Sequence, residues 1–279
     1  MRKWIILLMV AGVFVSASFA DEAAPQEDVQ SSAAESADDE KAALAKAVQN
    51  PVADLISVPF QWNIGFDTGP EGATGSVLNI QPVIPFNLNE DWNLITRTIV
   101  PIINQPPMGA LGREEWGLGN IQFSSFFSPK DSGEWIWGVG PIFEFPTKTN
   151  DILASDNYSA GPTFVALKMD GPWVYGGLIN QLWSFCGDDP EVNKMLIQPF
   201  VNYNMDDGWY LVSAPIMIAD WTRDSNNQWT IPVGGGIGKI VKIGKLPLNL
   251  STNIYYNVES PDTGSNWSVR FQVQFLFPK

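Results

Sequence analysis

The chain has 279 residues, enough for one large domain or two ordinary ones. It carries 16 Lys and Arg against 30 Asp and Glu, and this balance of −14 argues against nucleic-acid binding, which needs clustered basic residues. Because the sequence has no histidine, it excludes Ser-His-Asp and Cys-His catalysis and histidine-ligated zinc. No cofactor or metal motif appears, so we expect no catalytic residue, no cofactor and no metal site.

Residues 1–20 have the pattern of a secretory signal peptide. Arg2 and Lys3 form a basic start, an apolar stretch of about 12 residues follows, and small residues precede a cleavage site at Ala20. The apolar stretch is shorter than the ~20 residues that a membrane-spanning helix needs. The pattern therefore predicts that the chain is exported.

Residues 21–56 form an acidic, Ala-rich segment. Residues 21–50 contain no aromatic residue, so they cannot bury enough apolar surface to fold alone. Only residues 41–48, rich in Ala, Leu and Lys, favour a short helix. We expect a periplasmic extension, and the sequence leaves open whether residues 40–56 plug the lumen of the domain that follows.

From Val58 onward, apolar and polar residues alternate with a period of two. In the last segment, Trp267, Phe271 and Phe275 alternate with Arg270 and Gln272. Helical spacing does not fit this pattern, whereas strands do. About 12 such segments are expected, at residues 57–66, 77–88, 92–104, 118–128, 135–146, 158–168, 173–185, 195–204, 209–219, 228–239, 247–258 and 266–277.

The segments are long, and their connections alternate in length. Segments of about 9–13 residues match tilted strands that cross a bilayer, whereas soluble strands have about 5–6. Short connections, such as residues 89–91, alternate with longer ones, such as residues 67–76 and 105–117. The sequence therefore predicts an all-β fold, an antiparallel transmembrane β-barrel of about 12 strands over residues 57–279. An even strand count puts both termini in the periplasm of a Gram-negative bacterium.

Four tryptophans each come directly after a short turn and are spaced by about the length of one hairpin with its loop: Trp92, Trp135, Trp173 and Trp209. Tryptophan favours the bilayer interface because its ring is apolar and its N–H needs a polar partner. Turn chemistry alone could produce one such coincidence. Four in register predict an aromatic girdle.

Three charged residues lie within predicted strands: Arg97, Glu144 and Arg270. Their apolar neighbours take the opposite parity, so all three are expected in the lumen, paired with one another or with Asn and Gln side chains. A pore-lining role and a role in riveting the barrel together both stay open. Arg97, Glu144 and Arg270 are the candidate lumen residues.

Several strands have apolar residues on both parities. Ile95 opposes Leu94, and Leu178 opposes Ile179. The lumen should therefore carry an apolar stripe. Either small hydrophobic or aromatic solutes slide along it, or the segment of residues 52–56 folds in and covers it. Deleting residues 21–56 should raise conductance only in the second case.

Six stretches of the sequence form a set of motifs that spreads over most of the chain from residue 50 onward: residues 50–61, 78–86, 89–97, 127–130, 135–141 and 275–279. These motifs resemble those of the bacterial outer-membrane barrel family named for a meta-pathway of phenol degradation, whose members are often labelled transporter or, mistakenly, neuromedin U. The resemblance implies an outer-membrane barrel that passes small, often hydrophobic, compounds, and it implies no catalytic residue. Pro278 and Lys279 follow the terminal Phe277, a departure from the usual aromatic end of such barrels.

The function expected is therefore a non-enzymatic channel for passive passage of small hydrophobic or aromatic compounds. Its expected partners are the outer-membrane bilayer, a small-molecule solute and the barrel-insertion machinery, with no nucleic acid. Three alternatives stay open: a structural or adhesive barrel with a closed lumen, a barrel enzyme that uses carboxylates alone, and a soluble Trp-rich binding sandwich. Conductance, hydrolysis of lipid or peptide, and extraction without detergent would separate them.

Overall fold

The structure, a computed structural model, describes residues 41–107, 113–187, 190–244 and 246–277. The predicted signal peptide, the first part of the acidic extension and the last two residues lie outside these described ranges. Within the described ranges, no helix is long and apolar enough to cross a membrane.

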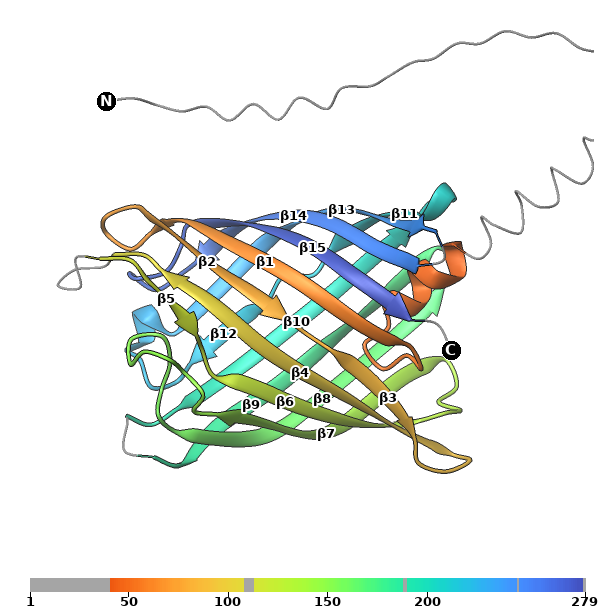
Figure 1. Cartoon of the computed structure of the whole chain (residues 1–279), viewed down its shortest axis with the longest axis horizontal. Helices are drawn as coiled ribbons and strands as arrows, with labels where there is room; N and C mark the ends of the chain where they lie inside the picture. Colours follow the sequence, from red (N-terminus) through yellow and green to blue (C-terminus); the bar gives the residue numbers. More distant parts are fainter. Residues whose placement is uncertain (1–40, 108–112, 188–189, 245, 278–279) are drawn as a thin grey trace, which may run out of the picture. The chain divides into compact units, whose positions relative to one another are not determined.

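A single antiparallel sheet closes on itself, because the last strand, β15, pairs with the first, β1, from Ile56↔Phe277 to Phe66↔Trp267 (Figure 1). The strand bounds are β1 (Ile56–Thr68), β2 (Ala73–Ile80), β3 (Val83–Asn87), β4 (Trp92–Gln105), β5 (Glu115–Leu118), β6 (Ile121–Pro129), β7 (Trp135–Phe145), β8 (Tyr158–Asp170), β9 (Trp173–Cys186), β10 (Asn193–Asn204), β11 (Trp209–Ser213), β12 (Met217–Asp220), β13 (Trp229–Ile243), β14 (Leu246–Glu259) and β15 (Trp267–Phe277). Two short 3₁₀ turns, η2 (Asp206–Gly208) and η3 (Ser225–Asn227), connect strands.

Three of the crossings are each interrupted once, so the 15 strands make 15 − 3 = 12 crossings of the barrel wall. The breaks fall between β2 and β3, between β5 and β6, and between β11 and β12. Two of them contain a proline, Pro82 and Pro215, which has no N–H to donate to the ladder. The prediction of an antiparallel barrel of about 12 strands is confirmed, and the closed sheet excludes a two-sheet sandwich.

The predicted loop at residues 67–76 is wrong. Strand β1 ends at Thr68 and strand β2 begins at Ala73, so only residues 69–72 connect them. Gly69 and Gly72 both have positive φ angles, and the N–H of Gly72 donates to the carbonyl of Gly69 at 3.2 Å. The period-2 pattern fails near this turn because small residues carry no burial signal.

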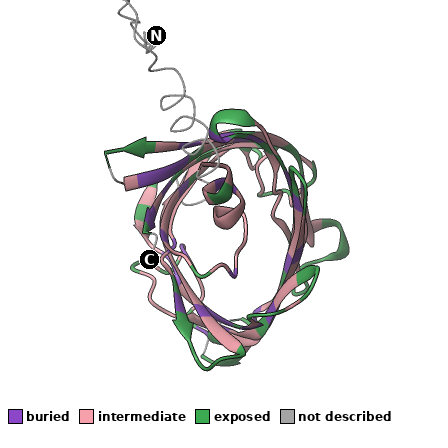
Figure 2. Cartoon of the chain, turned by 90° about the vertical axis from the view of Figure 1, so that its right-hand side faces the viewer, coloured by how far each residue is buried: buried purple, intermediate pink, exposed green. Residues whose placement is uncertain are grey.

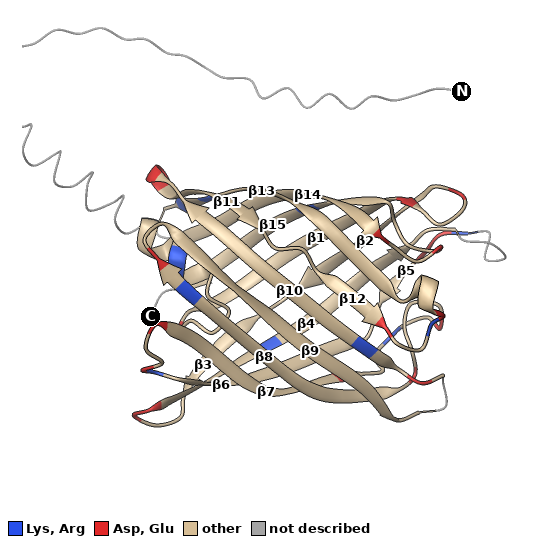
Figure 3. Ribbon diagram, turned by 180° about the vertical axis from the view of Figure 1, so that it is seen from behind, with Lys and Arg blue, Asp and Glu red and all other residues tan. Residues whose placement is uncertain are grey.

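The barrel is apolar outside and polar over much of its interior. Exposed apolar side chains project from strands all around the wall, among them Trp62, Phe127, Val139, Phe164, Ile179, Val201, Leu211, Ile237, Ile254 and Phe271. The buried polar side chains include Gln61, Gln81, Ser124, Thr163, Asn202, Asn249, Asn253 and Gln274. Charged residues gather towards the two ends of the barrel (Figure 3). This distribution is that of a wall surrounded by an apolar medium.

Residues 41–48 form a helix at the end of the barrel where β15 ends, and residues 49–55, here called the inner segment, pass from it into the barrel (Figure 2). The inner segment turns at Asn50, whose side-chain oxygen accepts the N–H of Val52 at 3.0 Å. Such an Asx turn reverses the chain locally. The chain then leaves the interior and begins β1 at Ile56.

Candidate functional site

A cavity of about 210 Å³ lies inside the barrel. Strands on opposite sides of the wall line it together with the N-terminal helix and the inner segment. Amide and hydroxyl side chains form much of the lining, and Val83, Leu178 and Phe200 are among its apolar members. Arg97 and Arg270 are its two charged residues, and within the described ranges its lining has no Asp, Glu or Lys.

A chain of hydrogen-bonded amides joins these two arginines. The Nε of Arg97 donates to Oε1 of Gln81 at 3.2 Å, and the amide of Gln81 donates to Gln61 at 2.8 Å. The amide of Gln61 in turn donates to Oδ1 of Asn63 at 3.3 Å. The same Asn63 oxygen accepts the Nε of Arg270 at 2.9 Å. Each guanidinium is therefore held by neutral oxygens rather than by a carboxylate.

The breaks in the wall supply the two anchors. Gln81 lies in the break between β2 and β3 and accepts hydrogen bonds from both Nε and a terminal nitrogen of Arg97. Ala214 lies in the break between β11 and β12, and its carbonyl accepts a terminal nitrogen of Arg270 at 3.0 Å. The freed Ala214 N–H donates to the hydroxyl of Tyr255 at 3.2 Å. Interrupted strands thus expose the groups that fix the arginines.

Two tyrosines hold polar side chains of the cavity lining in place. The guanidinium of Arg270 lies 5.0 Å from the ring centroid of the buried Tyr255, a cation–π distance. The hydroxyl of Tyr210 donates to Asn249 at 2.6 Å, and the amide of Asn249 donates to Gln274 at 3.0 Å. These networks fix the polar side chains, so the cavity is preorganised rather than collapsed.

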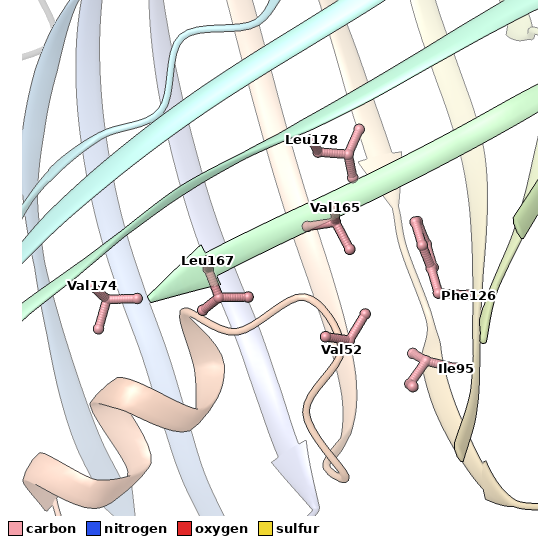
Figure 4. Close-up of a cluster of buried hydrophobic side chains, with 7 residues drawn as sticks. All are labelled: Val52, Ile95, Phe126, Val165, Leu167, Val174 and Leu178. Atoms are coloured by element: carbon pink, nitrogen blue, oxygen red, sulfur yellow. The ribbon is translucent and has the colours of Figure 1, made fainter. Parts of the chain in front are cut away.

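An apolar cluster lies beside the cavity, and the inner segment contributes Val52 to it (Figure 4). Val52 is 5% exposed and packs with buried side chains from β4, β6, β8 and β9, which are Ile95, Phe126, Val165, Leu167, Val174 and Leu178. Ile95 and Leu178 belong to the apolar stripe predicted for the lumen. The sequence leaves open whether a small solute or the segment of residues 52–56 covers the stripe. In the structure, Val52 of the inner segment covers this part of it.

A charged latch holds the N-terminal helix to the barrel mouth. Lys41 of the helix and Lys239 of β13 both pair with the carboxylate of Asp207, in the turn before β11. Hydrogen bonds from Lys239 first, and then from Lys41, lower the pKa of Asp207 to about 2. Beside the latch, the side-chain amides of Gln49 and Asn204 exchange hydrogen bonds of 2.8 and 3.1 Å.

Glu144 lies apart from the two arginines. It is next to the last residue of β7, on the same face as the buried Ile142, and its carboxylate accepts the amide of Gln122 at 2.7 Å. The structure therefore brings Arg97 and Arg270 to one cavity and leaves Glu144 outside its lining. None of the three pairs with another, and each uses a neutral partner.

The four tryptophans of the predicted girdle all begin strands at the end of the barrel that holds the latch. Trp135 and Trp173 pack against tyrosines, Trp92 packs against Trp137, and the ring of Trp209 lies 4.6 Å from the Lys239 ammonium. Sequence reasoning missed further aromatic contacts at the strand ends of the opposite side: Phe66 with Trp267, Phe145 with Tyr158, and Trp221 with Trp229.

Sequence reasoning also missed the amides and tyrosines that hold the arginines. The alternation in residues 57–66 puts the polar Gln61 and Asn63 on one face and the apolar residues on the other, but it does not pair either with a particular arginine. Pro82 and Pro215 mark the two breaks but could not have located the anchors by themselves, because other prolines, such as Pro101 in β4 and Pro141 in β7, lie inside unbroken strands.

These features define a closed, 12-crossing antiparallel β-barrel with an apolar exterior and a polar interior cavity, the class to which outer-membrane channels belong. Its fold is similar to that of a solved outer membrane channel from Pseudomonas putida F1, with 15% sequence identity and a TM-score of 0.63. That similarity covers 82% of this chain and 97% of the other.

Two other solved barrels are more distant. A FadL homologue from Pseudomonas aeruginosa shares 10% identity over 83% of this chain and 92% of its own, with a TM-score of 0.43. The outer membrane phospholipase of Salmonella typhi shares 11% identity over 84% of this chain and 98% of its own, also with a TM-score of 0.43. No family model matches the sequence, and no curated protein matches it.

Proposed function

We propose that the protein is an outer-membrane channel for passive passage of small hydrophobic or aromatic compounds. The single observation that carries the proposal is the interior cavity of about 210 Å³, enclosed by a barrel whose outer wall is apolar. The cavity has both polar and apolar walls, so it suits a compound with a small polar group and an apolar body. The fold shared with the Pseudomonas putida channel is consistent with this function.

The proposal includes an orientation and partners. The described ends of the chain, the N-terminal helix and the end of β15, share the barrel end that has the short turns, including residues 88–91 and 171–172. Outer-membrane barrels keep their short turns in the periplasm. Both termini would then be periplasmic, and the barrel-insertion machinery would place the wall in the bilayer.

A structural barrel with a closed lumen is the second candidate. The observation that favours it is the burial of Val52 in the apolar cluster, since this contact fills part of the interior. On this second hypothesis the inner segment stays in the lumen permanently. In the channel reading it is a plug that can leave.

Single-channel recording in planar bilayers tests both candidates. Full-length protein and a variant that lacks residues 21–55 are compared, and benzyl alcohol is added as a neutral aromatic solute. The channel reading expects a larger conductance from the truncated variant and short blocks of the current by benzyl alcohol. If neither protein conducts, and neither speeds benzyl alcohol uptake into vesicles with a lipopolysaccharide outer leaflet, the structural barrel takes its place.

A further inference from the structure

The interior cavity is positively charged although the protein is strongly acidic. The whole chain has a formal net charge of −14, yet the described lining of the cavity holds two arginines and no carboxylate. Glu144 is hydrogen-bonded to Gln122 and lies outside this lining. The charge of the cavity lining is therefore opposite in sign to the net charge of the whole chain.

Neither arginine has its charge neutralised within the described part of the chain. Among the described residues, the guanidinium of Arg97 bonds to the amide oxygen of Gln81, and that of Arg270 bonds to an amide oxygen and a backbone carbonyl. A buried charge without a counter-charge is costly, and proteins normally pair it. A guanidinium has five N–H donors, so these bonds leave donors on both groups for a further acceptor.

We propose that this cavity binds small organic carboxylates, with the carboxylate on the side of the cavity where Arg97 and Arg270 supply positive charge and the apolar part towards the opposite wall. A guanidinium matches the two oxygens of a carboxylate better than any other side chain does. The apolar part would contact Leu178, Phe200 and Val212, which belong to the same lining. The inference rests on the proposed channel function, because it names the class of compound that the channel takes.

The volume fits a compound of one aromatic ring. An apolar cavity of about 150 Å³ is large enough to bind benzene, and this one holds about 210 Å³. Benzoate therefore serves as the probe, and benzamide serves as its neutral counterpart of nearly the same shape. The difference between the two isolates the contribution of the negative charge.

Isothermal titration of the full chain in detergent at pH 7 tests the site directly. Benzoate should bind at least tenfold more tightly than benzamide. Arg97→Gln and Arg270→Gln should each weaken benzoate binding by about tenfold or more, since each removes one of the two positive charges of the lining, and should leave benzamide binding unchanged. Arg97→Lys and Arg270→Lys keep the charge and should retain part of the affinity.

Arg113→Gln is the matched control, because Arg113 is exposed and pairs with Glu115 outside the cavity. Slower gel mobility after boiling shows that each variant is folded. Equal binding of benzoate and benzamide by the unaltered protein would overturn the inference, as would benzoate binding that survives both glutamine substitutions. Because binding is measured without transport, arginine-dependent benzoate binding by a protein that does not conduct would retain the site and reject the channel.

Discussion

The ammonium of Lys41 and the carboxylate of Asp207, 166 residues apart in sequence, form an ion pair that fastens the N-terminal helix to the turn before β11. The second oxygen of Asp207 accepts Lys239 of β13 at 2.7 Å. Asp207 has a φ angle of +53°, which Asp tolerates better than most residues, and Gly208 follows with +72°. The turn thus presents one carboxylate to two lysines from separate parts of the fold.

Acid should release this latch. The pKa of Asp207 is lowered in the folded protein, from an ordinary value of 3.8 to about 2, so its stabilising contribution is complete above about pH 4 and is lost as the pH falls through 2. A spin label on Ala43→Cys in a Cys186→Ser background should become more mobile in this window. Asp207→Asn should make the label mobile at neutral pH.

Glu134→Gln is the control for the acid experiment. Glu134 pairs with Lys168, a contact that does not involve the helix, and that pairing lowers its pKa as well. The label in this variant should follow the same pH profile as in the unaltered chain. A label that stays immobile in Asp207→Asn would mean that the Gln49–Asn204 amide pair and Val52 hold the helix without the latch.

Val52→Asp should expel the inner segment from the barrel. An unpartnered polar group costs about 2–7 kcal/mol when it is buried in apolar surroundings, and Val52 is enclosed by the apolar cluster. The expected result is a higher single-channel conductance, while the gel mobility still becomes slower after boiling, as it does for the unaltered folded barrel. Val52→Ala, which only shortens the side chain, should raise conductance less. Equal conductance in all three proteins would show that the inner segment does not obstruct the pore.

The wall of the barrel is predictable from local sequence, because each strand has one face in an apolar medium and one in a polar interior. The parity rule therefore separates Trp62 from Gln61 and Phe271 from Arg270 without knowledge of the fold. Breaks within strands are less visible. The alternation continues across Gln81 and Pro82, so residues 77–88 are predicted as one strand although β2 and β3 are separate.

The contacts that build the cavity depend on the closed barrel and not on local pattern. Arg270 meets Asn63 only because β15 closes against β1, a pairing of the two ends of the chain. Lys41 meets Asp207 only because the helix returns to the barrel mouth. The composition of residues 41–48 predicts a helix but carries no signal of where that helix lies, and this is why the sequence predicts a periplasmic extension and leaves open whether residues 40–56 plug the lumen.

The aromatic residues at the barrel ends should contribute to stability in the bilayer. The ring of Trp135 lies 6.1 Å from that of Tyr175 in an edge-to-face arrangement, and 47% of Trp135 is exposed. Such a pair contributes about 0.5–1.5 kcal/mol beyond the area that it buries. Trp135→Ala should therefore lower the free energy of unfolding by about 1–2 kcal/mol in urea titrations with lipid vesicles.

Trp135→Phe is the companion variant, since it keeps an aromatic ring beside Tyr175 and removes the indole N–H together with the second ring. Its loss of stability should be less than half of that in Trp135→Ala. Equal losses in the two variants would assign the effect to the indole itself and not to an aromatic ring pair. No loss in either would remove Trp135 from the proposed girdle.

Substitutions of Glu144 distinguish a structural role of this charge in the barrel wall from a role in lining the pore. Its carboxylate accepts the amide of Gln122 at 2.7 Å across the β6–β7 pair, in register, and the cavity lies elsewhere. Glu144→Ala leaves that amide without its acceptor and should lower the free energy of unfolding by about 1–3 kcal/mol. Glu144→Gln keeps an acceptor oxygen at the same place and should recover most of the loss. Since the ion-selective charges on this reading are Arg97 and Arg270, the reversal potential in a salt gradient should stay the same in both variants. A reversal potential that shifts towards anions in Glu144→Gln while stability is unchanged would instead make Glu144 part of the conducting path.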